Sequence, residues 1–227
     1  RLFRPVRGIP PGARPRGTET RREPRGPLGG GHGRGGAAMT DGSVAAWMAD
    51  MAEGLAAARA VGERVVVMGT STGATLATAA LLSPDGREDV AGAVLVSPNF
   101  RIAAPAGALL TLPGARTWLP MVAGEARSFT PENADHAAYW TESYPTVALL
   151  PMAALVQAVR GSDLSAIDVP ALFWFSDADK VVSADATRAA AARWGGPVTL
   201  RPVTTGPGDD PSSHVLMGDI LSPGRTD

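Results

Sequence analysis

Short apolar runs alternate with stretches of helical periodicity along most of this chain. Four runs rich in β-branched or aromatic residues have the length and composition of strands, and the first three suit buried ones. They occupy residues 64–68, 90–96, 170–175 and 198–203. Three stretches between or beside them show the spacing of helices, and Ser43 and Ser183 stand as N-caps of the first and the last. These helical stretches are residues 43–60, 74–82 and 183–194. Such alternation predicts an α/β fold with a mostly parallel central sheet and helices on both faces.

The pentapeptide Gly69-Thr70-Ser71-Thr72-Gly73 lies between the first strand run and the helical stretch after it. A strand, a GxSxG sequence and a helix in this order are typical of a nucleophile elbow, a sharp turn that projects the serine hydroxyl outward. Glycine is needed two positions before and after the serine because side chains there would collide. Glycine-rich turns also bind phosphate, but no lysine follows as in a P-loop, and no GxGxxG is present.

An elbow serine needs an acid and then a histidine later in the chain. The run at 170–175 leads into a segment that offers two carboxylates, Asp177 and Asp179. The run at 198–203 leads into a loop that contains His214. Both partners therefore follow Ser71 in the required order.

These motifs give the chain, from Gly31 to its C-terminus, a similarity to the α/β-hydrolase superfamily. Within it the chain resembles the bacterial esterase, lysophospholipase and monoacylglycerol-lipase-like branch. The resemblance implies that Ser71 is the nucleophile, that Asp179 is the acid of a D-x-V-V pattern and that His214 is the base. Asp177 competes for the acid role, and the spacing to Val181-Val182 favours Asp179.

The same resemblance assigns the residues around the triad. The backbone N–H of Thr72, directly after the nucleophile, is expected to donate to the oxyanion, and a second donor from a loop after an early strand has no assigned position. Asp209 and Asp210 are expected to shape the loop that presents His214. The other two histidines, His32 in a glycine-rich turn and His136 in a polar helical stretch, are expected to be surface or loop residues. No metal or organic cofactor is required.

The stretch between Ser97 and Val169 is too long for an ordinary crossover. It carries two apolar clusters, at residues 108–121 and 144–159, the second helical after Pro145. In the resembling family this place holds a cap over the active site, so we expect a helical cap insertion at about 98–169. Its aromatic residues either line an acyl-binding space or pack the cap onto the core.

The charge of the chain is divided unevenly. Residues 1–36 hold nine arginines, ten glycines and six prolines against two glutamates, a net charge of +7, so the other 191 residues sum to −8. We expect this segment to be a disordered or aberrant tail, with the hydrolase-like domain at 37–227. The family has hydrophobic strands there, and a shifted reading frame or truncated gene model would account for their replacement. Arginine-rich runs also bind nucleic acid or anionic lipid, but without aromatic interleaving a specific nucleic-acid partner is not expected.

The remaining composition suits an enzyme domain. The 227 residues, 44% of them apolar, can bury one sizeable core. The chain has no cysteine, which suits a cytoplasmic location, and no apolar run long enough to span a membrane. The sequence leaves the oligomeric state unknown.

The first functional hypothesis is a serine hydrolase that cleaves a carboxylic ester of a small or lipid-like alcohol through an acyl-enzyme on Ser71. The second is a catalytically impaired hydrolase remnant, or a binding protein, that keeps the triad but lacks the early strands. The third is an acyltransferase or thioesterase that uses the same residues.

Overall fold

The computed structural model describes residues 35–225. The predictions for His32 and, apart from Gly35 and Gly36, for the arginine-rich tail fall outside this range. The helices are α1 Val44–Val61, α2 Thr72–Leu81, α3 Pro84–Arg87, α4 Ala115–Ala123, α5 Ala134–Tyr139, α6 Leu150–Gly161 and α7 Ala184–Ala192. The strands are β1 Val65–Thr70, β2 Val90–Val96, β3 Ala126–Ser128, β4 Ser143–Pro145, β5 Ala171–Phe175 and β6 Val198–Pro202. Short 3-10 turns lie at Gly36–Asp41, Pro105–Thr111, Thr146–Leu149, Leu164–Ala166 and Pro223–Arg225.

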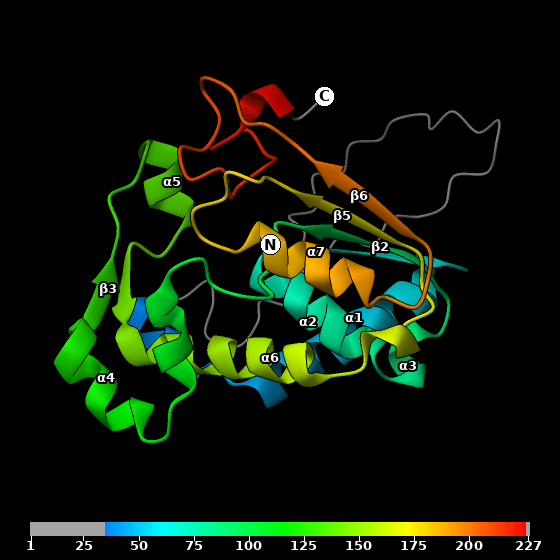
Figure 1. Cartoon of the computed structure of the whole chain (residues 1–227), viewed down its shortest axis with the longest axis horizontal. Helices are drawn as coiled ribbons and strands as arrows, with labels where there is room; N and C mark the ends of the chain where they lie inside the picture. Colours follow the sequence, from blue (N-terminus) through cyan, green and yellow to red (C-terminus); the bar gives the residue numbers. More distant parts are fainter. Residues whose placement is uncertain (1–34, 226–227) are drawn as a thin grey trace.

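The four predicted strand runs form one parallel sheet in the order β1-β2-β5-β6. In the register of this sheet, Gly69 of β1 pairs with Leu95 of β2, which in turn pairs with Phe173 of β5. The carboxyl ends of parallel strands meet at one edge, so the loops that follow β1, β5 and β6 emerge on the same side of the domain (Figure 1). The predicted parallel α/β fold is confirmed.

The hydrophobic core lies on one face of this sheet. Side chains along a strand point alternately to opposite faces. The odd-numbered residues Val67, Leu95 and Phe173 are at most 2% exposed and belong to one core cluster. Even-numbered residues on the other face, such as Met68 and Trp174, are only half-buried. The sheet therefore packs more tightly on one side than on the other.

The helices that join this core cluster are α1, α2, α6 and α7. Figure 1 shows them together on one side of the sheet. The sequence predicted helices on both faces, and within residues 35–225 the helical layer of the core covers one face. The strand pattern agrees with this arrangement, since even-numbered positions such as Val66 and Leu172 are apolar but only half-buried.

Helix starts agree closely with the sequence. Ser43 caps α1 by accepting a hydrogen bond from the Ala46 N–H, and Ser183 caps α7 by accepting one from the Ala186 N–H. Both serines have an extended backbone. Each side-chain oxygen accepts from an N–H of the first helical turn that has no acceptor within the helix. Among helices in the described range, none combines the length and the apolar character that crossing a bilayer requires.

The segment between β2 and β5 contains more than the helices expected there. Helices α4 and α5 lie in it, and strands β3 and β4 form an antiparallel ribbon that the sequence did not predict. Each of these strands has three residues, too few for a period-two pattern to stand out. Helix α6 packs against the elbow helix α2, and Leu155 and Val159 of α6 belong to the core cluster. The division into a tail, a domain and a cap at 98–169 stays a prediction.

Candidate active site

Ser71 occupies a strained turn between β1 and α2. Its backbone has φ 53° and ψ −123°, a conformation that residues other than glycine rarely adopt. A Cβ at Gly69 would lie 2.6 Å from the carbonyl oxygen of Gly73, so the strand and the helix can approach only with glycine at this position. The strand, turn and helix therefore form the elbow geometry that the sequence predicted.

Backbone hydrogen bonds hold this turn to the neighbouring strand. The Ser71 N–H donates to the Val96 carbonyl at 2.9 Å, and the Asn99 N–H donates to the Ser71 carbonyl at 3.2 Å. Thr75, one turn along α2, donates its hydroxyl to the Asn99 carbonyl at 2.7 Å. These contacts hold Ser71 in its strained conformation. A strained residue persists only when the surrounding structure fixes it in this way.

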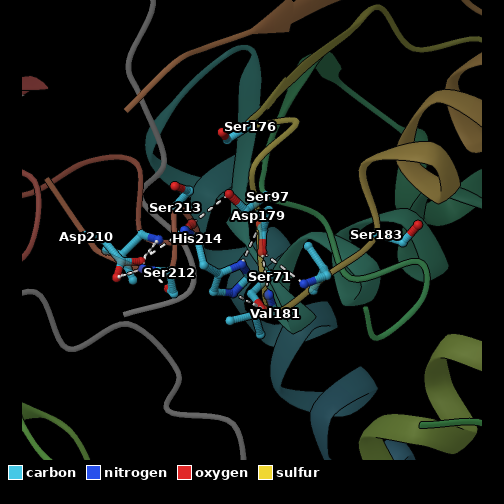
Figure 2. Close-up of polar contacts among 12 residues, drawn as sticks. Ser71, Ser97, Ser176, Asp179, Val181, Ser183, Asp210, Ser212, Ser213 and His214 are labelled. Carbon is cyan, nitrogen blue, oxygen red and sulfur yellow. Dashed lines mark hydrogen bonds and ion pairs between the residues drawn. The ribbon is translucent and has the colours of Figure 1, made fainter. Parts of the chain in front are cut away.

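The structure brings Ser71, His214 and Asp179 together (Figure 2). The His214 Nε2 lies 3.0 Å from the Ser71 Oγ, and the His214 Nδ1 lies 2.8 Å from the Asp179 Oδ2. The side chain of Asp179 is 1% exposed and that of His214 is 12% exposed. The three side chains come from the segments that follow β1, β5 and β6, so the parallel sheet brings these segments to one edge and the loops complete the alignment.

Asp179 is further held by its own loop. Its Oδ1 accepts hydrogen bonds from the N–H groups of Val181 and Val182 at 2.8 and 2.9 Å, which leaves Oδ2 directed at His214. Asp177, the competing carboxylate, instead forms a two-pronged contact with Arg188 at 2.7 and 2.8 Å and is largely exposed. The carboxylate that contacts the imidazole is therefore Asp179.

Asp210 organises the loop that carries His214. Its Oδ2 accepts from the Ser212 hydroxyl and from the N–H groups of His214 and Val215, and its Oδ1 accepts from the Ser212 N–H. Burial raises the pKa of Asp210, but these hydrogen bonds together outweigh it and hold the pKa below its usual value. The expectation that Asp210 shapes this loop agrees with these contacts.

Two further residues fix the histidine loop and were not singled out in the sequence. The fully buried Ser97, with φ 42°, donates its hydroxyl to the His214 carbonyl at 2.7 Å. Lys180 ties the acid loop to the histidine loop, since its N–H donates to the Ser212 carbonyl and its Nζ to the Pro211 carbonyl, each at 2.9 Å. Both contacts join residues far apart in the chain, so no local pattern could have revealed them.

Thr72 is the first residue of α2, so its N–H has no acceptor within the helix. It follows the nucleophile directly, at the positive end of the helix dipole, where a developing negative charge is stabilised. The second oxyanion donor, unplaced in the sequence, has no residue assigned to it among 35–225.

The expectation for His136 needs correction. It lies on helix α5, as predicted, but the residue is only 9% exposed and so does not lie on the surface. Its ring stacks on Phe129 with centroids 4.9 Å apart and meets Trp140 edge-on at 5.0 Å, while its Nδ1 accepts from the Glu132 N–H. This packing depends on how Phe129 and Trp140 fold around the helix. The polar sequence of α5 does not predict it.

The assembled groups offer a hydroxyl, an imidazole that can accept its proton, and a buried carboxylate that can fix the imidazole tautomer. Such a set can attack an acyl carbon. Across residues 35–225, no group of three or more histidine, aspartate or glutamate side chains is arranged to hold a metal ion.

Comparisons with known proteins give a family and a fold. The family model described as "Serine aminopeptidase, S33" matches residues 30–201. No curated protein matches the chain. A structure of the metagenome-derived lipolytic enzymes LipS and LipT is similar with a TM-score of 0.58 and 20% identity, over 78% of this chain and 69% of that one. A monoacylglycerol lipase from Paleococcus ferrophilus is similar with a TM-score of 0.52 and 17% identity, over 77% and 70% of the two chains.

Proposed function

Since this chain belongs to the S33 serine aminopeptidase family of α/β-hydrolases, we propose that it is a serine hydrolase that cleaves carboxylic esters through an acyl-enzyme on Ser71. The observation that carries the proposal is the hydrogen-bonded series from Ser71 Oγ through His214 to Asp179, with contacts of 3.0 and 2.8 Å. Both distances are within the reach that proton transfer between such groups requires.

In the first half of the proposed reaction, the Ser71 oxygen attacks the ester carbonyl carbon while His214 Nε2 takes the hydroxyl proton. Asp179, which accepts at 2.8 Å from the other ring nitrogen, stabilises the imidazolium that forms. The Thr72 N–H donates to the negative oxygen of the tetrahedral intermediate. The intermediate then collapses, the bond to the alcohol oxygen breaks, and His214 returns its proton to the departing alcohol.

In the second half, water takes the place of the alcohol. His214 removes a proton from the water as its oxygen attacks the acyl carbon, and the proton passes to Ser71 Oγ when the acyl-enzyme bond breaks. The products are a carboxylic acid and free enzyme, so atoms and charge balance without a cofactor. An acyl acceptor other than water would give acyl transfer with the same residues, and a thioester would be cleaved in the same steps.

The comparisons point to two kinds of scissile bond, an amide and an ester, and we propose the ester. The family description names an aminopeptidase, which cleaves an amide, whereas the solved structures above include lipolytic enzymes and a monoacylglycerol lipase. We propose a small or lipid-like ester, because an alcohol leaves the tetrahedral intermediate more readily than an amine, so the same serine and histidine cleave an ester more easily than an amide. We also propose a cytoplasmic location, which the absence of cysteine suits.

The test compares wild type with Ser71→Ala. We expect wild type to be labelled by a fluorophosphonate probe and to release nitrophenol from one or more of the acetate, butyrate, octanoate and palmitate esters. An aminoacyl nitroanilide, the amide control, should react much more slowly. Ser71→Ala should lose both labelling and turnover while its thermal midpoint stays near wild type. Activity that persists in Ser71→Ala would refute the proposal, and a folded wild type that neither labels nor turns over would favour the impaired remnant.

A further inference from the structure

A hollow of about 350 Å³ lies between helices α6 and α7, away from the triad. Its size falls within the range of small-molecule sites, roughly 300–1,000 Å³. Neither Ser71, Asp179 nor His214 lines it. The hollow is therefore a separate feature of the fold, and its lining indicates what it could hold.

The floor of the hollow is apolar and its rim is charged. Phe100 and Val159 form part of the floor and are 2% and 1% exposed. Because these two side chains are almost wholly covered, the apolar area open to a ligand comes mainly from Ala186 and Ala189 of α7, which are half-buried and exposed. Recognition must come mainly from the rim, and the apolar part of a ligand must be short.

Three arginines from separate segments gather on the rim: Arg101 after β2, Arg160 near the end of α6 and Arg193 after α7. Arg101 is fixed by donating to the Ser183 Oγ at 2.6 Å. Arg193 is fixed by donating to the carbonyls of Arg160, at 3.0 Å, and Ser162. Arg160 is exposed, and within residues 35–225 its guanidinium makes no hydrogen bond or ion pair.

Carboxylates offset part of this charge. Asp185, in the first turn of α7, lines the hollow itself. Asp163 lies near Arg193, and its pKa is lowered mainly by hydrogen bonds from Ser165 and in smaller part by the Arg193 charge. Three guanidiniums against two carboxylates leave the rim positive by one charge, and the exposed Arg160 has its donors available.

We propose that this hollow binds a short-chain carboxylate, with the Arg160 guanidinium donating to the carboxylate and the alkyl chain lying along Ala186 and Ala189. The planar fork of arginine donates two parallel hydrogen bonds to a carboxylate, a geometry that lysine does not offer. The covered floor limits the alkyl chain to a few carbons.

The hollow is joined to the acid loop of the triad. Two residues after Arg101, the Ala103 N–H donates to the Val181 carbonyl at 2.9 Å, and the Arg101 carbonyl itself accepts from the Ser183 N–H at 2.8 Å. Val181 is one of the residues whose N–H holds Asp179. The proposed ester hydrolysis releases a carboxylate, so the occupant would be a product that acts on its own enzyme; this link, unlike the binding itself, rests on the proposed function.

Binding is tested on the full chain by isothermal calorimetry with hexanoate, 1-hexanol and inorganic phosphate as probes. We expect hexanoate to bind, and hexanol and phosphate to bind at least about tenfold more weakly, because one lacks the charge and the other the alkyl chain. Equal binding of hexanol would refute the role of the arginines. Equal binding of phosphate would refute the choice of an alkyl carboxylate.

Three variants locate the site. Arg160→Gln should weaken hexanoate binding by about tenfold, the loss expected for one charge-assisted contact. Arg116→Gln, on the exposed surface of α4, is the matched control and should leave the affinity unchanged. Asp185→Asn should strengthen binding by up to about fivefold, since it removes an opposing charge from the rim. A merely structural effect of substitution would not raise the affinity. Unchanged binding in Arg160→Gln would overturn the proposal.

Calorimetry with hexanoate, an analogue of the proposed product, does not require turnover. The binding site and the esterase function can therefore be refuted independently of each other. Hexanoate binding that depends on Arg160 in a protein without esterase activity would keep the site and refute its link to catalysis. Esterase activity with no Arg160-dependent binding would keep the function and refute the site.

Discussion

Asp210→Asn isolates the contribution of one buried carboxylate to the histidine loop. Asp210 is 6% exposed and accepts four hydrogen bonds, from the Ser212 hydroxyl and from the N–H groups of Ser212, His214 and Val215. Asparagine has nearly the same shape but only one acceptor oxygen. If that oxygen takes the place of Oδ2, three contacts persist as neutral hydrogen bonds, and the Ser212 N–H faces an amide N–H.

The cost follows from these four contacts. Losing one hydrogen bond to a charged acceptor costs about 1.5–3 kcal/mol, and the remaining three weaken toward the neutral range. Local relaxation offsets part of this, so we expect the free energy of unfolding to fall by about 2–4 kcal/mol. A domain of this size is stable by roughly 5–15 kcal/mol, so the variant should remain folded at neutral pH. The His214 backbone should lose its fixed position, and kcat should fall while KM changes little.

Urea unfolding followed by tryptophan fluorescence measures the change, with Asp219→Asn as the matched control. Asp219 lies a few residues further along the chain and is exposed, so its substitution should change stability by at most about 0.5 kcal/mol. The slope of unfolding free energy against urea should be the same in all three proteins. An Asp210→Asn protein as stable and as active as wild type would refute the role given to this carboxylate.

Acid weakens the same contacts in wild type. Because the folded pKa of Asp210 lies below the ordinary value of about 3.9, its contribution is fully present above that pH and is lost as the pH falls through the folded pKa. The stability gap between wild type and Asp210→Asn should therefore be constant near neutral pH and shrink below about pH 4. A gap that widened toward low pH would contradict the assigned direction of the pKa.

Other substitutions probe the triad and the elbow. Asp179→Asn should lower kcat by roughly 10⁴, the precedent for a misoriented catalytic histidine. Asp177→Asn should leave kcat unchanged and cost at most about 1 kcal/mol of stability, because its ion pair with Arg188 is exposed. Equal losses of kcat in a nitrophenyl ester assay would contradict the assignment of the acid. His214→Ala should abolish fluorophosphonate labelling with little change in thermal midpoint, and undiminished labelling would remove His214 from the role of base. Gly69→Ala should lower the thermal midpoint and activity together, since the added Cβ would lie 2.6 Å from a backbone oxygen, whereas Gly161→Ala, with nothing within 4 Å, should be neutral; the comparison fails if both variants behave alike.

The sequence by itself determined the elements whose signals are local. The strand runs and the helix starts at Ser43 and Ser183 emerge where predicted, within a few residues, because β-branched and aromatic runs and N-capping serines are local features of the sequence. The need for glycine at position 69 was also predicted from the sequence, since a turn this sharp excludes a side chain. The four strands could be put in one parallel sheet because strands and helices alternate.

Tertiary structure alone decided which side chains meet. Ser71 and His214 are 143 residues apart in the chain, and only the parallel order of the strands places their side chains within 3.0 Å. The sequence could rank Asp177 and Asp179 but not separate them, because both follow β5 and differ only in the direction in which a short loop turns them. The β3-β4 ribbon and the one-sided helical layer have the same origin, since both depend on contacts between separate segments that leave no periodic trace in the sequence of either partner. The burial of His136 comes from nearer residues, Phe129 and Trp140, whose rings pack on the imidazole only once the chain around α5 has folded.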